Sequence, residues 1–309
     1  MPPSNYPNGF PNGLINQGLP VLNTYSGNVF WVDSATGGNG NPGTYLKPFA
    51  TLDYAIGRCT ANHGDLIMIK PNHAETITGI GGITFDVAGI TVKGLGNYNQ
   101  RPRFLMDGAT TVTAVVSAAD VTIENLVFAG GHNGIATCFD VDAVGFTSIG
   151  IEFEDNTANE HFLIAYTVGS TTDNTCDGLT IIDGKWYTPD AGPTAFISLT
   201  GDTDRATIVG NKVIADAASI QLLLHAAGDD LQGLVFTHNT IITALTTGDI
   251  LIDNNQSDNT GYAAYNLAGH HDTDAPVIID CDGIRQFENY SASEDTSSGG
   301  LRPAVDDFT

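Results

Sequence analysis

Short apolar runs that end at a polar turn residue recur through the middle of this chain. Five runs, each a β-branched stretch followed by Asn or Asp and a second apolar pair, can be laid over one another. Steps of 31, 27, 28 and 28 residues separate the polar residues. These residues are Asn125, Asn156, Asp183, Asn211 and Asn239. Such a period predicts stacked coils, because one coil cannot bury its own apolar face.

A second lane of apolar runs lies between the first ones. Alternation along the first lane places Ile123 and Ile181 inward, with Thr122 and Glu124 outward. Two lanes on one period predict an all-β fold, a parallel β-helix with coils of about 28 residues. A β-sandwich, with strands every 8–12 residues or so, competes but does not explain the shared period. The second lane comprises residues 112–116, 138–141, 162–165, 195–199, 220–224 and 249–252.

The recurring Asn and Asp residues predict a column at one turn of the coil. Their side chains bond to nearby backbone and tolerate left-handed geometry, which suits tight turns. When the coils stack, the column would form an asparagine ladder. Asp183 is therefore interpreted as part of this turn column and not as a catalytic carboxylate.

A short amphipathic helix is predicted in the stretch 48–59, within a cap at 48–62 that precedes the first full coil. Thr51 is a candidate N-cap. One face of the helix carries Leu52, Ala55, Ile56 and Cys59. A solenoid end exposes core and strand edge, so this helix is expected to cover it.

Four segments follow from these patterns. We expect an extended arm at 1–29, an opening strand and capping helix at 30–64, the β-helix at 65–288 and a tail at 289–309. Pro-Asn-Gly occurs twice in the arm, which excludes a helix there. The arm nevertheless carries apolar side chains that nothing local can bury, so we expect a partner chain to bind them. They are Tyr6, Phe10, Leu14, Ile15 and Leu19.

The net charge limits the kinds of partner that this protein is expected to bind. The 309 residues carry a net charge of −24, with an isoelectric point near 4.2. Such a surface repels nucleic acid and anionic membranes. The four cysteines form no C-x-x-C pair, which favours buried thiols in a reducing compartment. No signal peptide and no membrane span is expected.

The search for catalytic carboxylates gives one candidate pair. Glu152 and Glu154 share the outward face of one predicted strand, about 6.6 Å apart, which fits an inverting glycosidase. In a chain with 35 acidic residues, two solvated surface acids are the simpler interpretation. Polygalacturonase motifs are missing, apart from Asp229-Asp230 and Gly131-His132-Asn133. We therefore predict no catalytic residues.

The search for metal and cofactor sites gives only weak candidates. The Asp-rich segments 202–204, 229–230 and 253–255 lack the spacing of an EF-hand, and 270–272 has adjacent histidines that point apart. No phosphate-binding or dinucleotide motif is present. We predict no metal and no cofactor. Trp31 and Trp186 could stack on sugars or simply pack.

The first part of the chain resembles a known group of proteins. Phe30-Trp31-Val32-Asp33, a Gly-rich stretch at 37–43 and the segment 43–51 are similar to the start of many right-handed parallel β-helix proteins. NTYSGNVFWVDS and the Pro-Asn-Gly arm resemble β-helix virion proteins of tailed bacteriophages. The resemblance covers roughly residues 1–75. It implies a right-handed coil and a role as head decoration protein, head fibre or tailspike.

The resemblance, the arm and the missing motifs lead to one expected function. We expect a structural capsid decoration (cement) protein that is not an enzyme. It would bind the major capsid protein through its arm, form a homotrimer, and lie on the virion exterior after assembly in the host cytoplasm. The alternative is a tailspike or fibre that binds or cleaves host surface polysaccharide, so a glycan partner is possible. A bacterial polysaccharide lyase would require a signal peptide and a calcium cluster.

Overall fold

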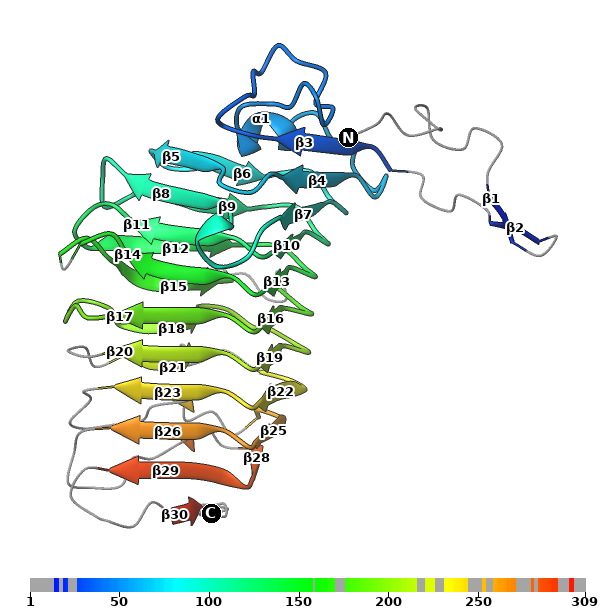
Figure 1. Ribbon diagram of the computed structural model, residues 1–309. Coiled ribbons are helices and arrows are strands. Elements are labelled where there is room, and N and C mark those ends of the chain that lie inside the picture. The colour runs from blue at the N-terminus through cyan, green and yellow to red at the C-terminus, as the bar shows by residue number, and fades with distance from the viewer. Residues whose placement is uncertain are drawn as a thin grey trace.

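The chain forms a parallel β-solenoid of about seven turns, with about 27 residues per turn (Figure 1). This confirms the predicted fold class and period. The stacked coils form three long sheets, and strands pair between successive coils in parallel. The computed structural model describes residues 14–16, 19–21, 27–157, 159–169, 176–215, 220–225, 231–243, 252–253, 258–270, 279–280, 283–293 and 300–302.

The first sheet follows the first predicted lane. Its strands are β3 (Val29–Val32), β4 (Leu66–Ile69), β7 (Thr91–Gly94), β10 (Thr122–Glu124), β13 (Thr147–Ile149), β16 (Thr180–Ile182), β19 (Thr207–Val209), β22 (Leu234–Thr237), β25 (Gly261–Ala264) and β28 (Ile284–Phe287). In the middle of the sheet, β10, β13, β16 and β19 each have a buried central side chain between two outward neighbours, as Ile123 in β10 shows. The inward positions of Ile123 and Ile181 agree with the predicted alternation.

The second sheet follows the first after a tight turn. Its strands are β5 (Ala74–Thr78), β8 (Arg103–Asp107), β11 (Val127–Gly130), β14 (Glu152–Asp155), β17 (Lys185–Thr188), β20 (Lys212–Ala215), β23 (Thr240–Thr243), β26 (Leu267–His270), β29 (Asn289–Ser293) and β30 (Gly300–Arg302). β29 pairs in parallel with β26, and β30 runs antiparallel to β29. The segment predicted as a tail from residue 289 thus begins with a strand of the solenoid.

The third sheet closes each coil and holds the second predicted lane. Its strands are β6 (Ile83–Phe85), β9 (Ala114–Val116), β12 (Ile135–Val141), β15 (Phe162–Val168), β18 (Ala195–Leu199), β21 (Gln221–His225), β24 (Ile252–Asp253) and β27 (Ile279–Asp280). A 3-10 turn, η1 (Tyr98–Gln100), lies between β7 and β8. Every described pairing in this sheet is parallel, as stacking of one repeated coil requires.

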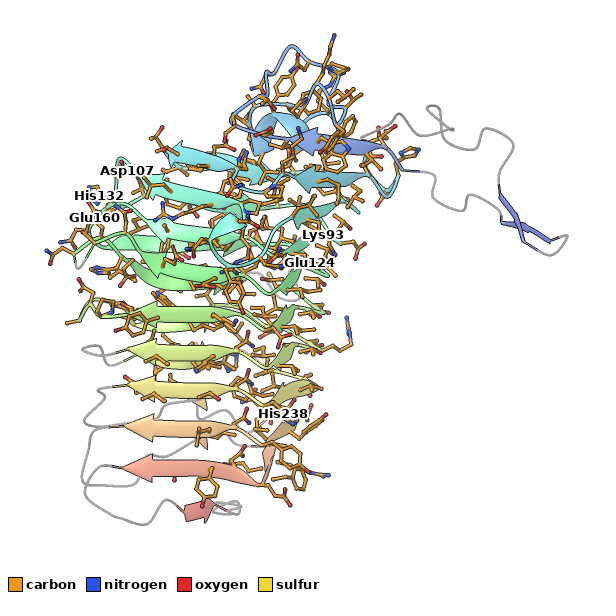
Figure 2. All side chains as sticks on the ribbon, in the orientation of Figure 1. Lys93, Asp107, Glu124, His132, Glu160 and His238 are labelled. Atoms are coloured by element: carbon orange, nitrogen blue, oxygen red, sulfur yellow. The ribbon has the colours of Figure 1, made fainter. Side chains whose placement is uncertain are left out.

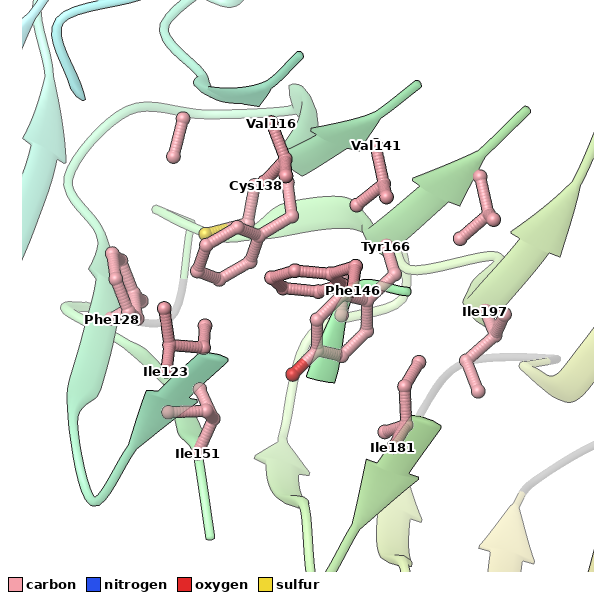
Figure 3. Packing of buried hydrophobic residues seen from close by; sticks show 14 of the residues in the cluster. Val116, Ile123, Phe128, Cys138, Val141, Phe146, Ile151, Tyr166, Ile181 and Ile197 are labelled. Atoms are coloured by element: carbon pink, nitrogen blue, oxygen red, sulfur yellow. The ribbon is translucent and has the colours of Figure 1, made fainter. Parts of the chain in front are cut away.

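Aromatic side chains from successive coils stack along the centre (Figure 3). Phe153 lies at the middle of this stack and contacts rings from three coils, including Phe128, Tyr166 and Trp186. The hydroxyls of Tyr166 and Ser148 are 2.6 Å apart, so this buried phenol has a polar partner. Burial raises the pKa of Tyr166 far above its usual range. The core is therefore continuous from coil to coil.

The predicted Asn/Asp column is wrong in register. Between the first and second sheets lies a two-residue turn, and its first residue takes a left-handed conformation, with φ 58° at Asn125 and 55° at Asp183. The second residue points inward, and there Asn211 and Asn239 belong to a buried ladder with two later residues, Asn266 and Asn289. Each ladder Oδ1 accepts the backbone N–H of the same position one coil earlier.

Asn156 does not belong to this turn at all. It follows β14, at the connection to the third sheet, where its amide donates to Glu160 over 2.8 Å. The five residues thus occupy three kinds of position. The first turn residue favours Asn because its backbone is left-handed, and the second favours Asn because its side chain joins the buried ladder. Residue type alone therefore does not show which of the two turn positions an Asn occupies.

The capping helix is α1 (Leu52–Ile56), shorter than predicted. Leu52, Ala55 and Ile56 are fully buried against the first coil, and Cys59 lies just after the helix, partly buried, with its Sγ 3.4 Å from the Ala55 carbonyl. Thr51 makes no side-chain cap bond, contrary to the prediction. A carboxylate from the second sheet takes this role.

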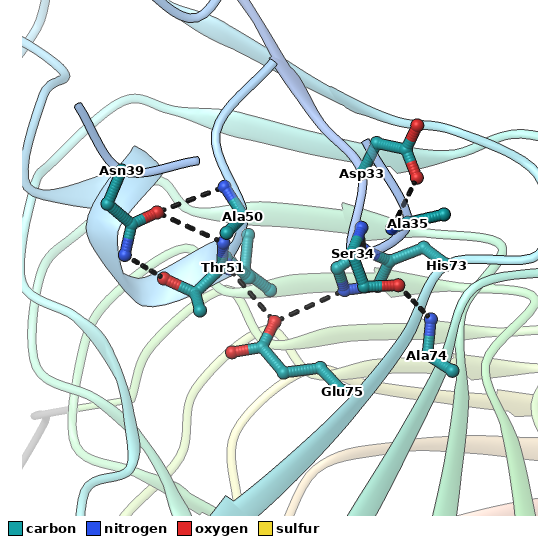
Figure 4. Close-up of polar contacts among 10 residues, drawn as sticks. Asp33, Ser34, Ala35, Asn39, Ala50, Thr51, His73, Ala74 and Glu75 are labelled. Carbon is teal, nitrogen blue, oxygen red and sulfur yellow. Dashed lines mark hydrogen bonds and ion pairs between the residues drawn. The ribbon is translucent and has the colours of Figure 1, made fainter. Parts of the chain in front are cut away.

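Glu75, in β5, accepts the Leu52 backbone N–H over 3.0 Å (Figure 4). The same Oε2 lies 3.2 Å from His73 Nε2, while His73 Nδ1 accepts the Ser34 backbone N–H over 3.0 Å. His73 therefore carries its proton on Nε2. This network attaches the opening segment to the first coil, so the polar groups of His73 and Glu75 have a structural role.

The described part of the N-terminal arm is a hairpin. β1 (Leu14–Asn16) and β2 (Leu19–Val21) pair antiparallel in a sheet of their own, apart from the stack in Figure 1. Leu14, Ile15 and Leu19 lie in these strands, whereas Tyr6 and Phe10 lie outside the described residues. The predicted binding role of the five side chains stays a prediction.

Candidate functional site

The predicted carboxylate pair lies on the outer face of the second sheet. Glu152 forms an ion pair with Arg101, and Glu154 Oε2 lies 3.4 Å from Arg103 Nε. Both arginines belong to the β8 coil and reach across β11, where the intervening outward residues are Val127 and Ala129. Each glutamate thus has an arginine partner from another coil, and the two ion pairs link coils across the outer face of the sheet.

A different set of acids meets at the corner between the second and third sheets. Asp155 is the last residue of β14, one position after Glu154, so alternation turns its side chain inward. Its Oδ2 accepts the hydroxyl of Thr188 over 2.7 Å. Its Oδ1 and the indole N–H of Trp186 are both buried without a well-aligned hydrogen bond, although the indole lies close enough to lower the pKa of the carboxyl. A buried carboxyl oxygen without a well-aligned donor is unusual in a structural role.

His161 and Asp190 complete this group, which we call the acid cluster (Asp155, His161 and Asp190). His161 is 4% exposed, and its Nδ1 lies 3.2 Å from Asp190 Oδ2, within ion-pair distance but outside hydrogen-bond geometry. The chain approaches the ring closely on one side, since a Cβ added to Gly192 would lie 2.1 Å from His161 Nε2. A larger residue at 192 would displace the imidazole.

Burial raises the pKa of the Asp155 carboxyl above that of an ordinary aspartate. The Thr188 and Trp186 side chains and the charge of His161 oppose this rise, and the nearby Asp190 adds to it. Desolvation is the largest of these effects. The cluster thus places a carboxyl with a raised pKa beside a second acidic side chain and an imidazole. A buried titratable group with a perturbed pKa and close charged neighbours is a candidate for acid–base chemistry.

Polar side chains surround the cluster at the surface. Figure 2 places Asp107, His132 and Glu160 along the same edge of the solenoid. The His161 backbone N–H donates to the His132 carbonyl over 3.2 Å, and Asn156 bonds to Glu160. The corner is therefore a partly exposed polar edge with a buried acid beneath it.

The other predicted positions do not join this group. Asp204 Oδ1 accepts the Gln232 backbone N–H over 3.2 Å, which is a structural contact between coils. Trp186 is buried, and Trp31 packs edge-on against Tyr45. Within the described ranges, no three His, Cys, Asp or Glu side chains gather as a metal site. Residues 229–230, 254–255 and 271–272 lie outside the described residues.

The sequence contained only one weak signal for the acid cluster. A polar residue stands at an inward position of β14, where the strand pattern calls for an apolar one. Asp155 and His161 lie close together in one coil but form no known motif. Asp190 comes from the next coil, and only the stacking of the coils brings it to them, so residue spacing could not reveal the cluster.

Comparisons with known proteins address the fold. No family model and no curated protein matches the chain. Among solved structures it is similar to a rhamnogalacturonan lyase, with 16% identity and a TM-score of 0.52, over 89% of this chain and 78% of that one. A GH136 lacto-N-biosidase from Eubacterium ramulus aligns with 11% identity and a TM-score of 0.39, over 87% and 67% of the two chains. Within the described residues, no helix is long and apolar enough to span a membrane.

The expectation that the chain is not an enzyme is corrected by this finding. The fold is shared with a polysaccharide lyase, so the missing polygalacturonase motifs do not argue against catalysis on it. At 16% identity the likeness concerns the fold alone. Function has to be argued from this chain's own residues.

Proposed function

We propose that this chain is a tailspike or fibre-type protein that binds and cleaves polysaccharide, with Asp155 as its proton donor. The observation that carries the proposal is the buried, partly unbonded carboxyl of Asp155 beside His161 and Asp190. The fold supports it, since the similar solved structure is named a rhamnogalacturonan lyase. The resemblance of residues 1–75 to phage virion proteins supports the tailspike context.

Cleavage of a glycosidic bond needs a proton at the departing oxygen. A raised pKa increases the fraction of a carboxyl that carries a proton at a given pH, and the protonated form can deliver that proton as the C–O bond breaks. In hydrolysis a carboxylate such as Asp190 would activate water, and in elimination a base would take the proton next to the sugar carboxylate. Proton delivery from Asp155 is common to both routes.

The test is incubation of the purified protein with a panel of neutral and acidic polysaccharides. New reducing ends report any cleavage, and absorbance at about 235 nm reports the unsaturated sugar that only elimination forms. We expect oligosaccharides from at least one bacterial surface polysaccharide. Intact polymers throughout a broad panel, at several pH values, would count against the proposal.

A second candidate function is attachment to the outside of a phage head as a decoration protein, as a homotrimer. It is favoured by the N-terminal arm, whose hairpin β1–β2 forms a sheet separate from the solenoid. An arm of this composition needs a partner for its apolar side chains. Repeated attachment to a lattice would then gain from multivalency.

Deletion of residues 1–26 tests the arm in either context. We expect a folded solenoid, because β3, α1 and the first coil remain and supply the described core. Binding to purified virions that lack this protein should be lost, as measured by co-sedimentation. If the shortened chain still co-sediments like the full chain, the arm is not the anchor.

A further inference from the structure

The outer face of the second half of the second sheet carries two of the few basic residues of this acidic chain. In β17, β20 and β23 the outward residues are Lys185, Tyr187, Lys212, Ile214, Thr240 and Ile242. None is acidic, although the chain has 35 acidic and only 11 basic residues. We call these six residues the basic face. Such a local reversal of charge on a chain of net charge −24 needs an explanation.

Two lysines stand side by side at its centre. Lys185 pairs directly with Lys212 in neighbouring strands, about 4.8 Å apart, and both side chains are exposed. Like charges directly opposite each other destabilise a sheet. Within the described strands, no other two cations are in direct register. A bound anion would relieve this repulsion.

Five other cations of the described residues are paired within the protein, whereas among these residues no ion pair forms at Lys47, Arg58 or Arg285. Lys70, Lys93, Arg101, Arg103 and Arg205 each form an ion pair with a carboxylate; Figure 2 labels Lys93 with its partner Glu124. Within the described residues, no carboxylate lies within ion-pair distance of Lys185 or Lys212, although Glu152 is the register neighbour of Lys185. Arg101 takes that glutamate instead. The two ammonium groups thus remain available to a ligand.

An aromatic ring adjoins the lysines. Tyr187 is two residues beyond Lys185 on the same face and is 54% exposed. Exposed tyrosine rings present an apolar face for sugars, with a polar tip toward water. Thr188 follows in the same strand and bonds to Asp155. Thr188 lies three residues, about 10 Å, along the strand from Lys185 and faces inward, so the lysines and the acid cluster lie at opposite faces of this sheet.

We infer that the basic face binds an anionic polysaccharide, with Lys185 and Lys212 on its carboxylate or sulfate groups and Tyr187 against a sugar ring. The inference rests on the proposed function for its assignment as a substrate-binding surface, but binding itself can be tested separately. A sheet face that spans several coils suits a polymer, because the groups that it presents lie in rows across neighbouring strands. An acidic protein would be the other partner for such charges, and exposed Tyr and Ile among the lysines favour a sugar.

Binding to polygalacturonate, heparin and neutral dextran tests the inference, measured by affinity electrophoresis at low salt. The wild type should bind at least one of the two anionic polymers and not dextran, and added salt should weaken binding. The double variant K185Q/K212Q should bind that polymer at least tenfold more weakly. The matched control K47Q/R58Q removes the same charge from exposed positions outside the basic face and should bind like wild type.

The outcomes separate this inference from the proposed function. Binding that depends on Lys185 and Lys212 without cleavage would support the basic face and remove the catalytic proposal. Equal weakening in both double variants would show only an effect of net charge and would overturn the inference. Failure to bind either anionic polymer would also overturn it and would direct attention to an acidic protein partner.

Discussion

Replacing Phe153 with alanine is expected to lower the free energy of unfolding by about 3–5 kcal/mol, the cost typical of a buried phenylalanine. Phe153 is 1% exposed and lies 5.2 Å from the Tyr166 ring and 5.8 Å from the Phe196 ring, centroid to centroid. Its removal leaves a cavity that three coils would share, and the stacked backbone cannot collapse into it. Urea denaturation followed by circular dichroism measures the loss.

Ile242 supplies the control for this change. It lies on the same sheet but points outward and is 44% exposed. Ile242→Ala should cost less than about 1 kcal/mol, because surface substitutions disturb little packing. Equal losses for the two variants would mean that the aromatic stack does not hold the coils together.

Replacing Asp155 with asparagine is expected to reduce cleavage at least a hundredfold, within the range of about 10²–10⁴ that a general acid contributes. Asparagine keeps the size of the side chain and can still accept the Thr188 hydroxyl, but it has no proton to give. The rate of new reducing ends on the best substrate of the wild type measures the effect. Glu154→Gln, one position away and facing outward, should retain activity.

The sign of the pKa shift shows that Asp155→Asn should not unfold the protein. Burial raises the pKa of Asp155 in the folded state, so its ionisation opposes folding. The resulting loss of stability is absent at pH values below the ordinary aspartate pKa and is fully present at pH values above the raised pKa of Asp155. A neutral asparagine removes it, so the melting temperature at neutral pH should be unchanged or higher. A variant that melts earlier and is inactive would therefore contradict the assignment.

The repeating part of the fold could be predicted from the sequence. The alternation around Ile123 and Ile181 and the shared period are local features that every coil repeats, and the cap residues Leu52, Ala55 and Ile56 follow helical spacing. The register of the turn could not be predicted. Asn125 and Asn211 have the same side chain but meet different demands, a left-handed backbone in one case and a buried ladder in the other.

The candidate site could not be predicted from sequence patterns. Alternation correctly places Glu152 outward, but its partner Arg101 lies 51 residues earlier, two coils away. The acid cluster likewise depends on which coil stacks on which. In the sequence, Asp155 is unusual only because it is a polar residue at a strand position where an inward-facing apolar residue is expected. The stacking of the coils, and not local sequence propensity, brings the side chains of the candidate site together.

The measurement closest to the central claim is the titration of the Asp155 carboxyl itself, because it requires no knowledge of the substrate. Carbon-13 NMR of aspartate-labelled protein, assigned by comparison with Asp155→Asn, gives the midpoint directly. We predict a midpoint clearly above that of an ordinary aspartate, as the burial of this carboxyl requires. A midpoint at or below the ordinary value would show that Asp155 is an ionised structural acid and would contradict its role as proton donor.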